Sequence, residues 1–247
     1  VGRATISSGN ASGLYVYNSA GFKVQNLIFK GSGRETNKGC GVDFYMDLPN
    51  TRLAYIAIDN VEAFGYGEVG IIIGSWEGSS GYDDVAITNC SAHDNGDKGI
   101  ATYAFDNKIG HKKVYIAHSK AYNNSGIPDR TNIHSGSGIV MGGVDGGIIE
   151  YCEAYNNGWL NAWVSGGPVG IWGYLCNNLI IQYNESHHNK TGTSKDGGGF
   201  DIDGGSTNSI MQYNYSHNND GAGYLLAQYD YAPPMKNIIG RYNISEN

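Results

Sequence analysis

Apolar and polar residues alternate along most of the chain with a period of two, which is typical of β-strands that bury one face. A glycine followed by an apolar, a variable and a second apolar residue recurs eight times, at Gly13, Gly41, Gly70, Gly99, Gly138, Gly170, Gly199 and Gly223. The successive gaps are 28, 29, 29, 39, 32, 29 and 24 residues. No segment shows sustained helical periodicity. A repeat of this length predicts stacked structural units.

A second pattern runs in step with the first and reads apolar, polar, then Asn, Tyr or His, then a smaller residue. Its fourth position holds Val61, Cys90, Ser119, Cys152, Asn184, Asn214 and Asn243 in turn. A coil of two or three strands cannot bury its inner face alone, whereas coils stacked about 4.8 Å apart pair each strand with its equivalents above and below. Two columns in register predict an all-β chain folded as a parallel β-helix of about eight coils, with residues 1–247 as one domain. Connections between parallel strands are right-handed in nearly all proteins, which supports a right-handed parallel β-helix.

The fourth column predicts an interior stack. Asn184, Asn214 and Asn243 are expected to form a buried ladder in which each side-chain amide bonds its neighbours. Cys90 and Cys152 fall in the same column two coils apart, which separates them by roughly 10 Å and excludes a disulfide.

Composition narrows the function classes. The formal net charge of −7 argues against a nucleic-acid partner, because phosphates need a basic footprint. No stretch approaches the roughly 18 apolar residues of a membrane span. The chain lacks an initiator Met and a signal peptide, so we expect it to be part of a longer secreted chain.

These motifs resemble the parallel β-helix repeat of the pectate-lyase-like superfamily. The resemblance rests on the Gly-apolar-x-apolar run, the Ile-x-Asn-Cys run at Ile87 to Cys90 and the His- and Asn-containing turn that follows, and it covers all eight coils. It implies a secreted, extracellular or periplasmic protein that acts on polysaccharides through a groove on the outer face of the first strand of each coil. The motif sets of polygalacturonases and of the common pectate lyases are absent, so the resemblance specifies the fold and not the reaction.

Alternation assigns the outward side chains of this groove strand, because successive residues point to opposite faces. The residue after each glycine points inward and the next points outward. Aromatic rings stack on sugar faces and carboxylates bind hydroxyls, so a column of both types predicts a carbohydrate groove. The alternative is that the aromatic residues serve only as strand formers. The predicted subsites on this strand are Asp43, Tyr45, Tyr103, Trp172 and Tyr174.

The longest insertions lie between the second pattern and the next glycine, over residues 125–137, 158–168 and 190–198. All three are expected on one side of the groove strand, where the loops of a solenoid form its binding edge. Trp159, Trp163 and Asp196 are therefore further candidate binding residues, and Asp196 and Asp230 are reserve acids.

Asp201 and Asp203 are the predicted catalytic pair. Both point outward from one strand, two residues apart, so their Cβ atoms should lie roughly 6.5 to 7 Å from each other. That spacing is compatible with inverting glycosidases, which leave room for a water between two carboxyls. Apolar neighbours could raise the pKa of one of them, as a general acid requires. The alternatives are a calcium ion held with Asp196 and a merely solubilising role. No residue is assigned as a metal ligand.

Three functional hypotheses follow. The first is a glycoside hydrolase acting on a polysaccharide or oligosaccharide. The second is a non-catalytic carbohydrate-binding or adhesin module. The third is a calcium-assisted polysaccharide lyase. None of the sixteen predicted outward positions is Lys, Arg or His, and the nearest such residues are Arg130, His134 and Lys195 in the loops. Because a lyase needs a base and a counter-charge for a uronate, this favours hydrolysis of neutral sugars.

Overall fold

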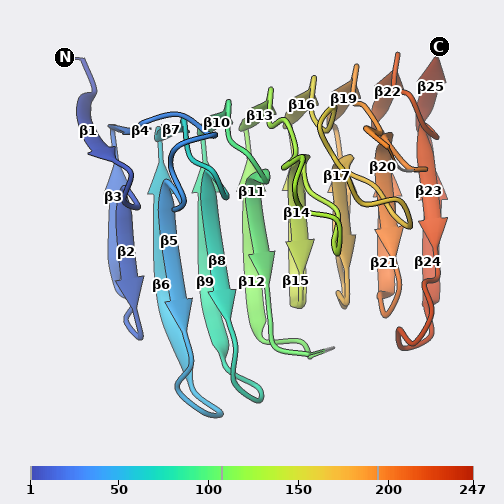
Figure 1. Cartoon of the computed structure of the whole chain (residues 1–247). Helices are drawn as coiled ribbons and strands as arrows, with labels where there is room; N and C mark the ends of the chain where they lie inside the picture. The colour runs from blue at the N-terminus through green and yellow to red at the C-terminus, as the bar shows by residue number, and fades with distance from the viewer. Residues whose placement is uncertain (1, 107, 194, 247) are drawn as a thin grey trace.

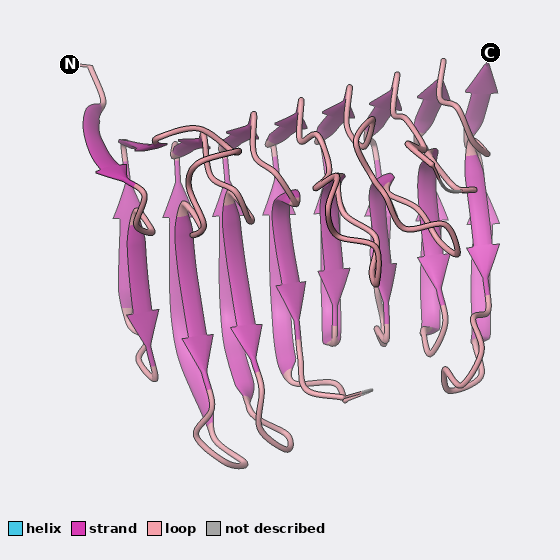
Figure 2. Cartoon of the chain, viewed as in Figure 1, coloured by secondary structure: helices cyan, strands magenta, loops and turns pink. Residues whose placement is uncertain are grey.

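The computed structural model describes residues 2–106, 108–193 and 195–246. Within these ranges the chain consists of β-strands joined by turns and loops, with no helix (Figure 2). The coils stand side by side in sequence order, and the two termini lie at opposite ends of the row (Figure 1). This confirms the predicted all-β parallel solenoid of about eight coils.

Each coil contributes one strand to each of three parallel sheets. Sheet A contains β1 (Ala4–Gly9), β4 (Leu27–Gly31), β7 (Glu62–Phe64), β10 (Ser91–His93), β13 (Lys120–Tyr122), β16 (Glu153–Tyr155), β19 (Glu185–His187), β22 (Tyr215–His217) and β25 (Ile244–Glu246). Sheet B contains β2 (Leu14–Tyr17), β5 (Val42–Met46), β8 (Ile71–Ser75), β11 (Lys98–Tyr103), β14 (Ser137–Gly142), β17 (Val169–Tyr174), β20 (Gly198–Asp203) and β23 (Tyr224–Ala227). Sheet C contains β3 (Phe22–Gln25), β6 (Arg52–Asp59), β9 (Gly81–Thr88), β12 (His111–Ala117), β15 (Val144–Glu150), β18 (Ile180–Gln182), β21 (Thr207–Gln212) and β24 (Lys236–Arg241).

Sheet B is the predicted groove strand, and its register follows the glycine repeat. Ile71 pairs with Ile100, Ile100 with Ile139, and Ile139 with Ile171, so the residue after each glycine stacks on its equivalents. These four side chains are fully buried in the core between the three sheets. The predicted inner column continues to the last rung, where Leu226 pairs with the buried Ile202. Leu226 is 51% exposed because β23 is the last strand of sheet B.

Asparagine ladders run through the interior. The amide of Asn184 donates to Asn214 at 3.0 Å and that of Asn214 to Asn243 at 3.1 Å, which confirms the predicted stack. The four cysteines are free, as expected for Cys90 and Cys152. A second, longer ladder occupies the turn from sheet A to sheet B, where successive amides donate to the next coil at 2.9 to 3.2 Å: Asn95, Asn124, Asn157, Asn189 and Asn219.

The turn from sheet C to sheet A always passes through a residue with positive φ, between 51° and 57°. Asparagine tolerates this left-handed conformation better than most residues. The first three coils have asparagine at this position, the fourth has histidine and the later coils have tyrosine. In chain order the residues are Asn26, Asn60, Asn89, His118, Tyr151, Tyr183, Tyr213 and Tyr242. Across the described ranges, no helix is long and apolar enough to cross a membrane.

Candidate functional site

The outer face of sheet B is partly covered. Loops that follow β13, β16 and β19 lie over it on the near side of Figure 1. Trp172 and Asp201 point outward as predicted, but only 6% of Trp172 and 4% of Asp201 is exposed. The expectation of freely exposed side chains along this strand is therefore wrong at these two residues. Trp172 forms a small outer apolar cluster with Val69, Ala101, Val140 and Val169.

A cavity of about 690 Å³ opens above this cluster. Its size lies within the range of small-molecule and sugar pockets. Four residues predicted as sugar-binding line it, namely Tyr103, Trp163, Trp172 and Tyr174. Two loop residues, Ile133 and His134, and the exposed Trp76 complete much of the wall. The structure therefore gathers residues from five coils and two insertions into one aromatic cleft.

The aromatic floor of the cleft is held rigidly. The Trp172 indole N–H donates to Ser137 Oγ at 3.2 Å, so its one polar group is satisfied. The Tyr174 ring packs against Trp172 with 5.3 Å between ring centroids. Tyr174 also leans over Gly142 on the coil below, where any side chain would overlap the ring. A ligand would therefore meet a preformed surface.

The acidic group lies beside the floor, on β20. Burial raises the pKa of Asp203 to about 6, and the negative charge of Asp196 adds to the increase. Its Oδ1 accepts a hydrogen bond from Gly204 N–H at 2.7 Å. Burial, then the charges of Asp203 and Asp196, raise the pKa of Asp201 well above its ordinary value. Asp201 Oδ1 is buried without a hydrogen-bond partner among the described residues.

Two contacts connect these carboxyls to the cleft. Asp196 Oδ2 accepts a hydrogen bond from Gly167 N–H at 2.7 Å. It also lies near Gly166, which lines the cleft together with Trp163. On the other side, burial and then the charge of Asp203 raise the pKa of Tyr229, a further lining residue. Asp196 and Asp203 are partly exposed, whereas Asp201 is enclosed.

Four other predicted residues lie outside the cleft lining. Asp43 and Tyr45 are on β5, where burial raises the pKa of Asp43 to about 6 and Tyr45 stacks on Tyr17. The guanidinium of Arg34 lies over the Trp159 ring, with 5.4 Å between Arg34 Cζ and the ring centroid. Asp230 is exposed in the loop after β23. None of these four lines the cavity described above, and neither do Asp196, Asp201 and Asp203, which lie beside it.

Sequence reasoning missed a cation in the cleft. Lys98 lies one residue before the repeat glycine, and it lines the cavity although no outward lysine was expected on sheet B. Its Nζ is 2.7 Å from Asp97 Oδ1, and Arg130 contacts the same carboxylate at 3.1 Å. Burial and then the charge of Lys98 lower the pKa of His134 to about 4, so this histidine is neutral above that pH. Trp76 and Tyr229 were also missed, because both belong to turns outside the repeat.

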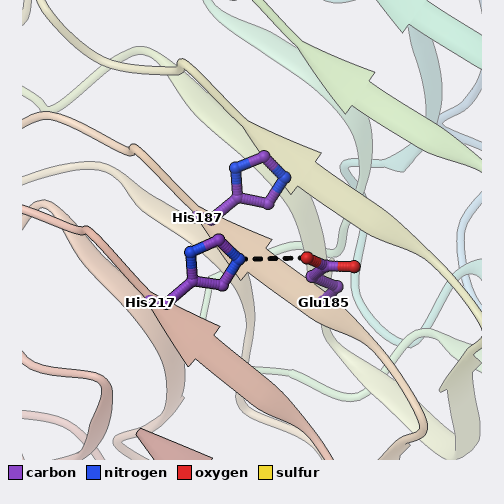
Figure 3. A group of neighbouring side chains, drawn as sticks. All are labelled: Glu185, His187 and His217. Atoms are coloured by element: carbon purple, nitrogen blue, oxygen red, sulfur yellow. Dashed lines mark hydrogen bonds and ion pairs between the residues drawn. The ribbon is translucent and has the colours of Figure 1, made fainter. Parts of the chain in front are cut away.

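The geometry of the described residues gives little support to a metal-binding site. Among the described residues, one group brings three His, Cys, Asp or Glu ligand atoms within 4.8 Å of each other, namely Glu185, His187 and His217 (Figure 3). The two imidazoles are stacked almost parallel at 4.7 Å, so their nitrogen lone pairs do not converge. His217 contacts Glu185 at 3.0 Å as His187 contacts Glu153 at 3.2 Å one coil earlier, which indicates a repeated structural contact. The three aspartates do not form such a group.

Comparison with known proteins places the fold. A family model described as a right handed beta helix region matches residues 79–237. A crystal structure of native GH136 lacto-N-biosidase from Eubacterium ramulus superposes with a TM-score of 0.58 at 18% sequence identity, over 94% of this chain and 42% of that chain. Its selenomethionine derivative gives a TM-score of 0.46 at 17% identity, over 95% and 43%.

No curated protein sequence matches the chain. The chain spans about two fifths of the length of the solved lacto-N-biosidase. Structural similarity at 18% sequence identity establishes a shared fold alone.

Proposed function

The chain belongs to the right-handed β-helix family, and from that premise we propose that it is a glycoside hydrolase with Asp203 as its general acid. Asp196 is the carboxylate that acts with it. The substrate is a neutral polysaccharide or oligosaccharide bound in the aromatic cleft, and the protein acts outside the cytoplasm.

The observation that carries this proposal is the raised pKa of Asp203 near a second carboxyl at the edge of the aromatic cleft. Burial, and then the charge of Asp196, raise the pKa of Asp203 to about 6, and Asp196 Oδ2 accepts a hydrogen bond from Gly167 N–H. A general acid needs a raised pKa of this kind, and glycoside hydrolysis uses a second carboxyl beside it. Asp203 would protonate the glycosidic oxygen, and Asp196 would activate water or stabilise the positive charge that develops on the sugar.

Asp201 takes a different role from the one its spacing suggests. With 4% of its surface exposed, it cannot reach a substrate directly. Its pKa is raised chiefly by burial, which disfavours the charged form. We assign it to positioning the β20 strand behind Asp203, while Asp203 retains the catalytic role predicted from the sequence.

The cleft supports a sugar ligand. Sugar rings have apolar faces that can pack on Trp172, Tyr174 and Trp163, and the cavity volume of about 690 Å³ suits a small sugar ligand. The solved lacto-N-biosidase is a glycosidase by name and has the same fold, which supports the class of reaction. Lys98 would favour an acidic sugar and the lyase alternative, but Asp97 already compensates its charge.

The test is release of reducing sugar from a panel of neutral and acidic polysaccharides and oligosaccharides. We expect Asp203→Asn and Asp196→Asn each to lower kcat by at least about a hundredfold, as for loss of a general acid or base. Asp201→Asn should lower it much less. Asp84→Asn is the matched control, because Asp84 is exposed on sheet C and has φ of 58°, a conformation that asparagine accepts.

Full activity of Asp203→Asn would refute the assignment. If the wild-type chain binds a glycan in the cleft but releases no sugar from any substrate, the binding-module alternative replaces the hydrolase.

A further inference from the structure

A second groove lies away from the cleft, at the edge where sheet C turns into sheet A. It has a volume of about 670 Å³ and runs along several coils. One wall is a tyrosine ladder, which we define as Tyr151, Tyr183 and Tyr213 with His118 and Tyr242 at its ends. Neighbouring rings are stacked 5.0 to 5.2 Å apart with interplanar angles of 3° to 15°.

The ladder is exposed although it is aromatic. The three central tyrosines are 51%, 44% and 43% exposed, in chain order. Because each ring face packs against its neighbour, the ladder presents ring edges and phenolic hydroxyls to solvent. These three hydroxyls have no hydrogen-bond partner in the described parts of the chain. The groove therefore offers a row of free hydroxyls at a spacing of one per coil.

The opposite wall is polar and also repeats. Lys120, Glu153 and Glu185 occupy equivalent positions on successive strands of sheet A. Lys120 Nζ lies 2.6 Å from Glu153 Oε2, which leaves the wall with a slight excess of negative charge. Such a wall accepts hydrogen bonds from hydroxyl groups and repels a polyanion.

The backbone disfavours tyrosine at these positions. Each ladder residue has φ between 51° and 55°, where the first three coils use Asn26, Asn60 and Asn89. A bulky residue in the left-handed region is strained, and strain of this kind persists where the side chain has a role. Stacking alone is the competing explanation, since it would favour aromatic rings without any ligand.

We propose that the tyrosine ladder binds an extended, neutral polysaccharide chain laid along the axis of the solenoid, as a second site that does not carry out the reaction. The tyrosine rings recur every 5.2 Å, and two successive coils also place a carboxylate on the polar wall, at Glu153 and Glu185. A ligand that matches several coils must itself repeat at a similar interval. A sugar polymer does so and carries hydroxyls on every unit, whereas a folded protein surface does not repeat in this way. The choice of ligand rests on the proposed function, but the binding does not depend on catalysis.

The experiment is affinity gel electrophoresis in the presence of galactan, xylan or mixed-linkage β-glucan. The parent protein carries Asp203→Asn so that the polymer is not digested. The first variant adds Tyr151→Phe, Tyr183→Phe and Tyr213→Phe, which keeps the stack and removes only the hydroxyls. The second variant places Asn at the same three positions, the residue that the fold uses in its first coils. Thermal unfolding is measured for each protein.

We expect at least one polymer to retard the parent and both triple variants to bind it at least tenfold more weakly. The Phe variant should keep the parental unfolding temperature, so it tests the proposal even if the Asn variant fails to fold. Trp163→Ala, a cleft variant, should still be retarded. The proposal is overturned if the Phe variant binds as tightly as the parent or if no polymer retards the parent.

These outcomes separate the two proposals. Sugar release by the wild-type chain, with retardation unaffected in the ladder variants, removes the second site and leaves the hydrolase. Loss of retardation in the ladder variants, without sugar release from any substrate by the wild-type chain, removes the hydrolase and leaves the second site.

Discussion

The proton on Asp203 should be visible in the stability of the protein. Its carboxyl is mostly buried beside Asp196, and its pKa rises from 3.8 to about 6. The unfolded chain ionises Asp at about 3.9, so between roughly pH 4 and pH 6 the folded state holds a proton that the unfolded state has lost. Stability must therefore fall as the pH increases through this window and then level off.

The size of the effect follows from the shift. Each pKa unit corresponds to about 1.4 kcal/mol, so a shift of about 2 units is equivalent to about 3 kcal/mol. Asp203→Asn removes the titration while keeping an oxygen that can accept the hydrogen bond from Gly204 N–H. The two proteins should be equally stable near pH 4, and the variant should be more stable by up to about 3 kcal/mol above pH 6.

The assay is urea unfolding of both proteins at half-unit steps from pH 4 to pH 8. Asp43 also has a raised pKa, but burial alone causes it and both proteins share it, so its contribution cancels in the difference. Burial is also the largest cause of the raised pKa of Asp201 and is common to both proteins, whereas the smaller effect of the Asp203 charge is lost in the variant. A difference in stability that stays flat across this range would show that Asp203 is not held protonated by its surroundings. The assignment of Asp203 as the general acid would then lose its physical basis.

Three further predictions concern activity and the scaffold. Because the general acid must be protonated, kcat/KM should fall about tenfold per unit as the pH rises above the pKa of about 6 of Asp203, measured as a pH-rate profile. Trp163→Ala should weaken the binding of a short oligosaccharide to the cleft by at least about tenfold in titration calorimetry, consistent with loss of an aromatic contact worth about 1.5 kcal/mol, whereas Trp159→Ala, outside the cleft, should change it less than about twofold. Asn157→Ala should lower the free energy of unfolding in urea by about 3 to 5 kcal/mol, because it leaves several buried polar groups without a hydrogen-bond partner. Asn132→Ala, in an exposed loop, should leave the free energy of unfolding almost unchanged.

The fold could be predicted because the sequence pattern that specifies it is periodic. Alternation along each strand and a step of about 29 residues fixed the inner face of sheet B, and the structure confirms it from Val42 to Ile202. Prediction failed where the chain leaves strand geometry. The ladder through Asn124 and Asn157 was missed because Asn123 and Asn156 have positive φ, which breaks the alternation just before each ladder residue.

The candidate site was less predictable for a related reason. Lys98 precedes the repeat glycine at the start of β11, where alternation counted from Ile100 gives the wrong face for it. Trp172 and Asp201 are buried because loops outside the repeat cover them. A periodic sequence pattern does not predict the paths of such loops. Residue types on sheet B still located the aromatic floor and the carboxyls, because those positions do follow the repeat.

The longer asparagine ladder also bears on how this protein can change over evolutionary time. The step from Gly99 to Gly138 is 39 residues and the next is 32, yet the ladder hydrogen bonds that Asn124 and Asn157 donate to the following coil are 3.0 and 2.9 Å. Six of the seven extra residues lie in the turn between β11 and β12, and that turn supplies Ala104 and Asp106 to the cleft. Insertions and deletions in the cleft walls are uncoupled from the scaffold, so substrate preference can diversify by loop exchange without a compensating mutation in the core.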